Sequence, residues 1–154
     1  MTKNLGSTNG YTTLIHYCNG KFFTQGGDYS YDGINWKSTN ISYIPNIYYV
    51  PGVGRYFTNI YSNTNTHTST DGVTWVSIGY KLCEVPTWGN GILVSYTEEN
   101  MLYSTDGVNW NKSSKVPREV SAAGTMQGYR SITFIKDKFI HSSNELSYSK
   151  DGIN

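Results

Sequence analysis

The sequence predicts an all-β protein built from four tandem repeats, and three observations support this fold class. A short motif, Ser-x-Asp-Gly-x-x-Trp, recurs along the whole chain of 154 residues. Its aspartates are separated by 39, 35 and 45 residues, a spacing that suits a unit of four strands or of two helices. Because no segment keeps a helical spacing of apolar residues without glycine or proline, we predict the four-strand unit.

Each copy of the motif predicts a β-hairpin. Asp-Gly is a strong signal for a two-residue hairpin turn, because a type I′ turn needs positive φ at both central residues. Ser and Asp side chains can bond to the turn backbone, and the Trp can cover it. The fourth copy ends one residue before its Trp. We therefore predict structural turn locks at Asp32, Asp71, Asp106 and Asp151, with Trp36, Trp75 and Trp110 packed in the core.

A pair of apolar strands is predicted before each motif. The expected pairs are residues 14–17 with 21–24, 47–50 with 55–58, 82–85 with 91–94, and 132–135 with 138–141. Each repeat then supplies four antiparallel strands in about 40 residues, which describes one blade of a β-propeller. We predict a single propeller domain over residues 1–154, with repeats at about 11–40, 41–79, 80–115 and 116–154.

The two ends of the chain are predicted to share a blade. The fourth repeat lacks its outer strand, and residues 3–9 resemble residues 34–40, with Leu5 at the position of Trp36. We expect the strand in residues 1–10 to complete the last blade, since closure removes open sheet edges. Closure within one chain gives a four-bladed monomer, and closure between two chains gives an eight-bladed homodimer. The sequence leaves both open.

The motif resembles the Asp-box, or BNR repeat, of sialidase-type propellers and their non-enzymatic relatives. The resemblance covers all four repeats, although the usual pattern has one residue between Asp and Gly; the shortened form resembles repeats of bacterial and phage proteins. It implies that the four aspartates hold turns away from any active site. A sialidase would also need an arginine triad, a Tyr–Glu pair and an acid/base Asp. The three arginines occupy unrelated positions, so the resemblance implies the fold without enzymatic activity.

Composition argues against several functional classes. The net charge is +1 and no run of like charges exceeds two residues, which does not suit binding to a nucleic acid duplex. No apolar stretch approaches the roughly 18–20 residues of a membrane span, and residues 1–10 lack a secretory core, so we expect a cytoplasmic or virion-associated protein. The two cysteines and three histidines lack metal-ligand spacing, so we predict no metal and no cofactor.

A ligand site is predicted at the axial mouth, where the inner strands of a propeller begin. Aligning the repeats places Tyr48 and Glu84 at one inner-strand position, with Arg130 and His16 nearby. Trp88 occurs in one repeat only and is expected to lie outside the repeat framework, either stacking on a sugar or base or packing locally. The candidate ligand-binding residues are Tyr48, Glu84, Trp88, Arg130 and His16.

These observations favour a non-catalytic recognition module that binds a glycan or a protein partner in a phage or bacterial surface context. The alternative is a module that binds or sequesters a small anionic or nucleotide-like ligand in the axial channel, using Arg130, lysines and aromatic rings. A third hypothesis is a glycoside hydrolase. That activity needs paired carboxylates, and no pair stands out in the sequence.

Overall fold

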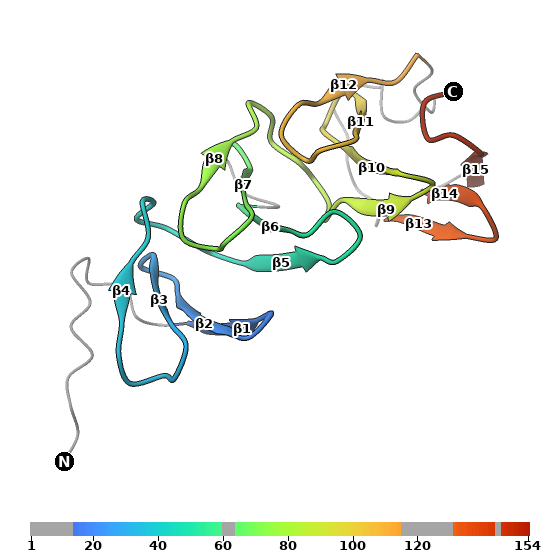
Figure 1. The fold of residues 1–154 in the computed structure, drawn as a ribbon. Helices are drawn as coiled ribbons and strands as arrows, with labels where there is room; N and C mark the ends of the chain where they lie inside the picture. Colours follow the sequence, from blue (N-terminus) through green and yellow to red (C-terminus); the bar gives the residue numbers. More distant parts are fainter. Residues whose placement is uncertain (1–13, 60–63, 115–130, 144–145) are drawn as a thin grey trace.

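The computed structural model describes residues 14–59, 64–114, 131–143 and 146–154, which form four antiparallel sheets and no helix (Figure 1). The all-β class is therefore confirmed, and the described residues form four antiparallel sheets of three or four strands. Each sheet is a meander of consecutive strands. Sheet 1 contains β1(Ile15–Cys18), β2(Lys21–Thr24), β3(Asp28–Ser30) and β4(Lys37–Ser38); sheet 2 contains β5(Ile47–Val50), β6(Arg55–Thr58), β7(His67–Ser69) and β8(Val76–Ser77). Sheet 3 contains β9(Thr87–Gly89), β10(Ile92–Tyr96), β11(Met101–Ser104) and β12(Asn111–Lys112); sheet 4 contains β13(Ser131–Ile135), β14(Lys138–Ser142) and β15(Leu146–Ser149).

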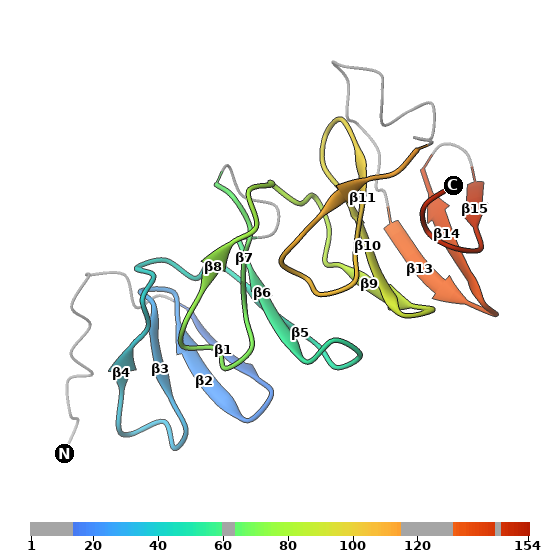
Figure 2. The same cartoon turned by 45° about the horizontal axis from the view of Figure 1, so that its top comes forward.

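The four sheets follow one another in chain order, with sheets 1 and 4 at opposite ends of the molecule (Figures 1 and 2). The first strands of neighbouring sheets lie close together where β1 meets β5 and β9 meets β13. The described sheets do not close into a ring. Sheet 4 has three strands, and the strand expected to complete it, in residues 1–10, lies outside the described residues.

Short turns fix the register of the first two strands in each sheet. Asn19-Gly20 joins β1 to β2 and Asn90-Gly91 joins β9 to β10, with positive φ at all four residues, as a type I′ turn requires. The third repeat differs from the prediction here, since its first strand is Thr87–Gly89 and not residues 82–85. The Asn90-Gly91 turn pairs Gly89 with Ile92, so the turn outweighs the apolar run before it.

This register places Trp88 inside the repeat framework, which corrects the prediction that it lies outside. Tyr17, Tyr49, Trp88 and Phe134 each stand one residue before the end of the first strand's ladder. Their partners on the second strands are Phe22, Tyr56, Leu93 and Phe139. Three of these pairs are ring pairs of nearly equal geometry: Tyr17–Phe22 at 4.9 Å and 54°, Tyr49–Tyr56 at 4.8 Å and 54°, and Phe134–Phe139 at 4.8 Å and 53°.

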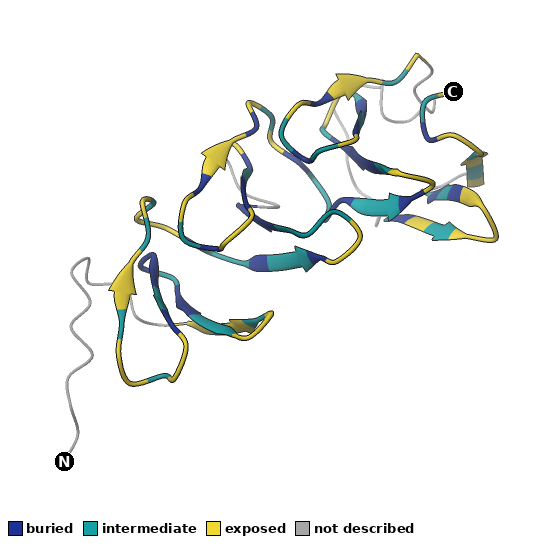
Figure 3. Cartoon of the chain, viewed as in Figure 1, coloured by how far each residue is buried: buried dark blue, intermediate teal, exposed yellow. Residues whose placement is uncertain are grey.

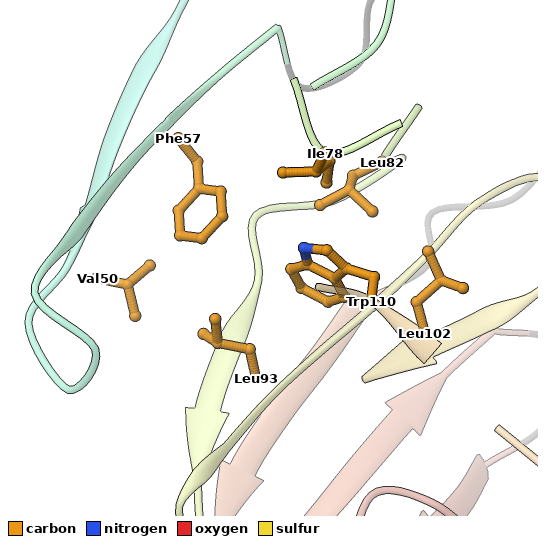
Figure 4. Packing of buried hydrophobic residues seen from close by; sticks show 7 residues of the cluster. All are labelled: Val50, Phe57, Ile78, Leu82, Leu93, Leu102 and Trp110. Carbon is orange, nitrogen blue, oxygen red and sulfur yellow. The ribbon is translucent and has the colours of Figure 1, made fainter. Parts of the chain in front are cut away.

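Among the described residues the core is divided into three clusters, each with side chains from two consecutive sheets. Phe23 of sheet 1 packs with Tyr56 and Trp75 of sheet 2. Between sheets 2 and 3, Trp110 is surrounded by apolar residues of both, as Figure 4 shows: Val50, Phe57, Ile78, Leu82, Leu93 and Leu102. The third cluster joins sheets 3 and 4 through Val94, Tyr96, Met101, Ile132 and Phe139. Each sheet therefore depends on its neighbour for burial.

The Asp-Gly hairpins are longer than the two-residue turns predicted from the motif. In sheet 1 the loop runs over six residues between Ser30 and Lys37, and of Asp32 and Gly33 only Gly33 has positive φ, at 73°. The side chains replace the missing backbone bonds. Ser30 Oγ donates to Asp32 Oδ1 at 2.9 Å, and the same oxygen accepts the N–H groups of Ile34 and Asn35 at 2.8 and 2.7 Å. The other three copies repeat these bonds.

These bonds favour the ionised carboxylates. The pKa of Asp32 lies well below its usual range because the backbone N–H and then the side-chain amide of Asn35 donate to it, followed by Ile34 N–H and the Ser30 hydroxyl. The pKa of Asp151 is lowered in the same way, with the Asn154 side chain as the largest cause. The motif carboxylates thus accept hydrogen bonds from the backbone of their own turns.

We expect the protein to lose stability as the pH falls below about 4. A carboxyl whose folded pKa is lowered stabilises the native state above its ordinary pKa, and that contribution disappears as the group is protonated. Urea unfolding at pH 6 and pH 3 measures the loss. Asp32→Asn should reduce stability at pH 6 and flatten the pH dependence, whereas Asp137→Asn, in an exposed turn outside the motif, should do neither. Equal behaviour of the two variants would contradict this prediction.

The motif glycines of sheets 2, 3 and 4 also bring their turns onto the preceding sheet. A Cβ at Gly72 would lie 2.9 Å from Phe23 Cζ, whereas a Cβ at Gly33 would meet nothing closer than Phe22 at 3.8 Å. Both residues have φ of 73°, so both alanine variants carry the same backbone strain of about 1–2 kcal/mol. Gly72→Ala should cost roughly 1–3 kcal/mol more than Gly33→Ala, because it overpacks a buried ring. Chemical denaturation of the two variants measures the difference, and equal losses would rule out the packing cause.

Candidate functional site

The predicted ligand-binding residues are spread over several sheets. Tyr48 on β5 and Trp88 on β9 both pack against the cluster between sheets 2 and 3. His16 is half-buried on β1 of sheet 1, and its Nε2 is buried without a hydrogen-bond partner. Glu84 lies in the connection before β9. Arg130 lies outside the described residues.

The contacts of Trp88 are those of inter-sheet packing. Its indole lies directly on the β5–β6 turn, where a Cβ at Gly52 would be only 2.1 Å from Trp88 Cδ1. Phe134 lies in the same way on the following sheet junction, where a Cβ at Gly89 would be 2.3 Å from its ring. The equivalent contact in two successive repeats gives Trp88 a structural role.

Glu84 links sheet 3 to sheet 4. Its Oε2 accepts the backbone N–H of Ile132 at 3.0 Å, and its own carbonyl accepts the hydroxyl of Ser95 at 2.8 Å. Partial burial raises the pKa of the Glu84 carboxyl to about 7, although the Ile132 N–H lowers it in part. The junction between sheets 3 and 4 therefore favours the neutral, protonated form of the Glu84 carboxyl.

The raised pKa of Glu84 predicts a stability change near neutral pH. The folded state holds the proton more tightly than the unfolded chain, so stability falls as the pH rises from about 4.5 to above 7. Glu84→Gln keeps an oxygen for the Ile132 N–H and removes the charge. We expect this variant to raise the thermal midpoint at pH 8 and to flatten the profile between pH 5 and 8, as differential scanning calorimetry can measure. Glu98→Gln, at an exposed position, is the matched control, and a response equal to that of Glu84→Gln would contradict the assignment.

A cleft of about 580 Å³ lies between sheets 2 and 3. One wall is the connection from β8 to β9, and the other is the β10–β11 loop, with one residue from β12. The lining residues are Asn65, Gly79, Tyr80, Lys81, Leu82, Cys83, Thr97, Glu98, Glu99, Asn100 and Lys112.

The strand order fixes the end of the sheets at which this cleft opens. Because consecutive strands are antiparallel, the first–second and third–fourth turns lie at one end of each sheet. The second–third loops and the connections between sheets lie at the other end. The cleft is built from this second group, so it opens away from the Asp-Gly turns.

The cleft presents polar groups around one aromatic ring. Asn65 and Asn100 carry amides, Tyr80 carries the ring, and each sign of charge is present twice, at Lys81 and Lys112 and at Glu98 and Glu99. Backbone amides of Glu99 and Asn100 bond to Thr97 Oγ1, at 3.3 and 3.1 Å, which holds the β10–β11 loop in shape. Such a cleft can bind a polar, uncharged ligand through many hydrogen bonds.

Sequence reasoning did not select this cleft. Its residues come from connections that differ between repeats, so no periodic pattern reports them. The only sequence signal is the pair of adjacent charges at Glu98 and Glu99, and both side chains are exposed. Tyr80, which packs partly against the neighbouring core cluster, has no counterpart that a repeat alignment would single out.

No three His, Cys, Asp or Glu side chains among the described residues lie where they could hold a metal ion together. The described part of the chain also contains no helix that could cross a membrane. No protein-family model matches the chain, and no curated protein matches it.

Proposed function

We propose that this chain is a non-catalytic recognition module of β-propeller type that binds a glycan in the cleft between sheets 2 and 3. The cleft of about 580 Å³, with amides, charges of both signs and the Tyr80 ring, is the observation that carries the proposal. Sugars offer many hydroxyls and one apolar ring face. A polar cleft with one aromatic side chain complements both.

The balance of charge in the cleft favours an uncharged saccharide over an anion. Lys81 and Lys112 are offset by Glu98 and Glu99 along the lining of the cleft. The alternative, a small anionic or nucleotide-like ligand, draws support from Lys81 and Lys112 alone. A protein partner is the remaining outcome, and a phage or bacterial surface remains the setting that the motif resemblance suggests.

The hydrogen bonds that the carboxylates accept support a role without catalysis. A glycoside hydrolase needs two carboxylates on either side of the scissile bond, one of them free to donate a proton. The motif aspartates accept bonds from their own turns, and Glu84 accepts a bond from the backbone of Ile132. Glu98 and Glu99 are adjacent in one exposed loop, so they approach a bound ligand from the same side.

The architecture supports the propeller part of the proposal. Four meander sheets succeed one another, and consecutive sheets pack together. The Asp-Gly turns of sheets 2, 3 and 4 each rest on the second strand of the sheet before. Propellers gather their ligand sites in loops at one end of the sheets, which is where the cleft opens.

Screening the full chain on a glycan array, followed by titration calorimetry with the best ligand, tests this function. Tyr80→Ala and Asn100→Ala should each weaken binding about tenfold, a loss of about 1.4 kcal/mol. Tyr31→Ala, at an exposed tyrosine in the opposite Asp-Gly loop, should leave binding unchanged. Thermal unfolding of Tyr80→Ala shows whether the fold is retained, and Asn100→Ala tests the cleft independently.

A blank array, or binding that neither cleft variant weakens, would overturn the glycan proposal. Turnover of a bound glycan that Glu84→Gln abolishes would favour the hydrolase. A thermal shift with nucleotides, lost in Lys81→Ala and Lys112→Ala, would favour the anionic ligand.

A further inference from the structure

The two end sheets expose faces that the inner sheets bury. We call the face toward the following sheet in the chain the leading face, and the face toward the preceding sheet the trailing face. Sheets 2 and 3 have both faces covered. The trailing face of sheet 1 and the leading face of sheet 4 lie at opposite ends of the molecule, where β1, β13 and β15 show exposed positions (Figure 3).

The contact between sheets 1 and 2 shows how a leading face meets a trailing face. On the leading face of sheet 1, Lys21 Nζ donates to Tyr56 Oη at 3.2 Å, and the ring of Phe23 lies 5.9 Å from that of Tyr56. Cys18 and Tyr29 pack against the same cluster, as does Tyr49 on the trailing face of sheet 2. The aromatic pair Tyr49–Tyr56 is therefore the surface on which the preceding sheet rests.

Sheet 4 carries the counterpart of that leading face. The strand registers make Ile135, Lys138, Ile140 and Tyr148 equivalent to Cys18, Lys21, Phe23 and Tyr29. On sheet 4 this face is open to solvent: Ile135 is 50% exposed, Tyr148 is 68% exposed and the neighbouring Leu146 is 79% exposed. Lys138 Nζ lies 5.1 Å over the Tyr148 ring, so the ammonium is already held on this face.

Sheet 1 carries the counterpart of the trailing face. Tyr17 and Phe22 form the same ring pair as Tyr49 and Tyr56, with nearly identical distance and angle. Tyr17 is nevertheless 67% exposed, and Ile15 on the same strand is 57% exposed. The Asp-Gly turn of sheet 1 also shows that this face is uncovered. A Cβ at Gly33 would meet no other sheet, whereas the equivalent glycines of the later sheets each meet side chains of the preceding sheet: Gly72, Gly107 and Gly152.

We propose that two copies of this chain associate head to tail, with the leading face of sheet 4 in one copy packed on the trailing face of sheet 1 in the other. The occupant is a second copy because the chain already uses this contact between its own repeats, and the two open halves lie at opposite ends of one molecule (Figures 1 and 2). Exposed apolar faces of this kind mark interaction surfaces. The contact is heterologous, since different faces meet.

One difference from the internal contacts follows from the sequence. Phe22 occupies the position that Tyr56 occupies in sheet 2. Because Phe22 has no hydroxyl, Lys138 cannot donate the hydrogen bond that Lys21 donates to Tyr56. The ammonium instead faces the rings of Phe22 and Tyr17, where a cation–π contact replaces the hydrogen bond.

The test uses two variants, each of which disrupts one of the two faces. Tyr17→Glu places a charge on the trailing face of sheet 1, and Tyr148→Glu places one on the leading face of sheet 4. Val76→Glu, at a 46% exposed position on β8, is the control for adding a charge at an exposed apolar site. Light scattering coupled to size exclusion, over a range of concentrations, measures the mass, and circular dichroism checks the fold.

We expect the parent chain and Val76→Glu to reach at least twice the monomer mass, and each face variant alone to stay monomeric. An equimolar mixture of Tyr17→Glu and Tyr148→Glu should regain the mass of two chains, because each variant retains the face that the other lacks. A parent that is monomeric at every concentration, or a mixture that stays monomeric, would overturn the proposal. If the glutamate variants fail to fold, Tyr17→Ser and Tyr148→Ser are used in the same mixing experiment.

Discussion

Packing between consecutive sheets is the interaction on which the rest of this structure depends. Each sheet has three or four strands, some of only two residues, and such a sheet has little independent stability in water. Burial is gained when the aromatic pair of one sheet, such as Tyr49 with Tyr56, meets the second strand of the sheet before it. The three apolar clusters are therefore interfaces between sheets, and the chain is held together as a series of neighbour contacts, as in other repeat proteins.

The Asp-Gly loops make this packing possible because hydrogen bonds within each loop hold the hairpin closed. Ser and Asp side chains saturate the loop backbone, so the glycine can present its bare Cα to the preceding sheet. Polar bonds between repeats complete the arrangement: the Asn40 amide donates to the carbonyl of Trp75 at 3.0 Å and accepts its N–H at 2.7 Å. The motif carboxylates therefore stabilise the turns, and the cleft opens at the other end of the sheets.

At that other end, the loops vary while the sheets stay alike. The cleft with Tyr80, Lys81 and Asn100 is built from the connection between sheets 2 and 3 and from one hairpin loop. Separating a uniform scaffold from variable loops lets a repeat protein change its ligand without disturbing its core. The same uniformity leaves matching faces at the two ends of the array, because a repeat that packs on its neighbour within the chain can pack on an equivalent repeat outside it.

The sequence by itself determined the all-β class, the four repeats, the positions of most strand pairs and the residues of the turn motif. Those features depend on local rules, namely strand pattern, Asn-Gly turns and the Ser–Asp side-chain bonds. Tertiary structure decided the rest. It moved the first strand of the third repeat to Thr87–Gly89 and so placed Trp88 among the packing aromatics. It tied Glu84 to Ile132, 48 residues away, and gathered the cleft from separate loops. Contacts between residues so distant in the chain depend on how one sheet rests on the next, and no local pattern carries that information.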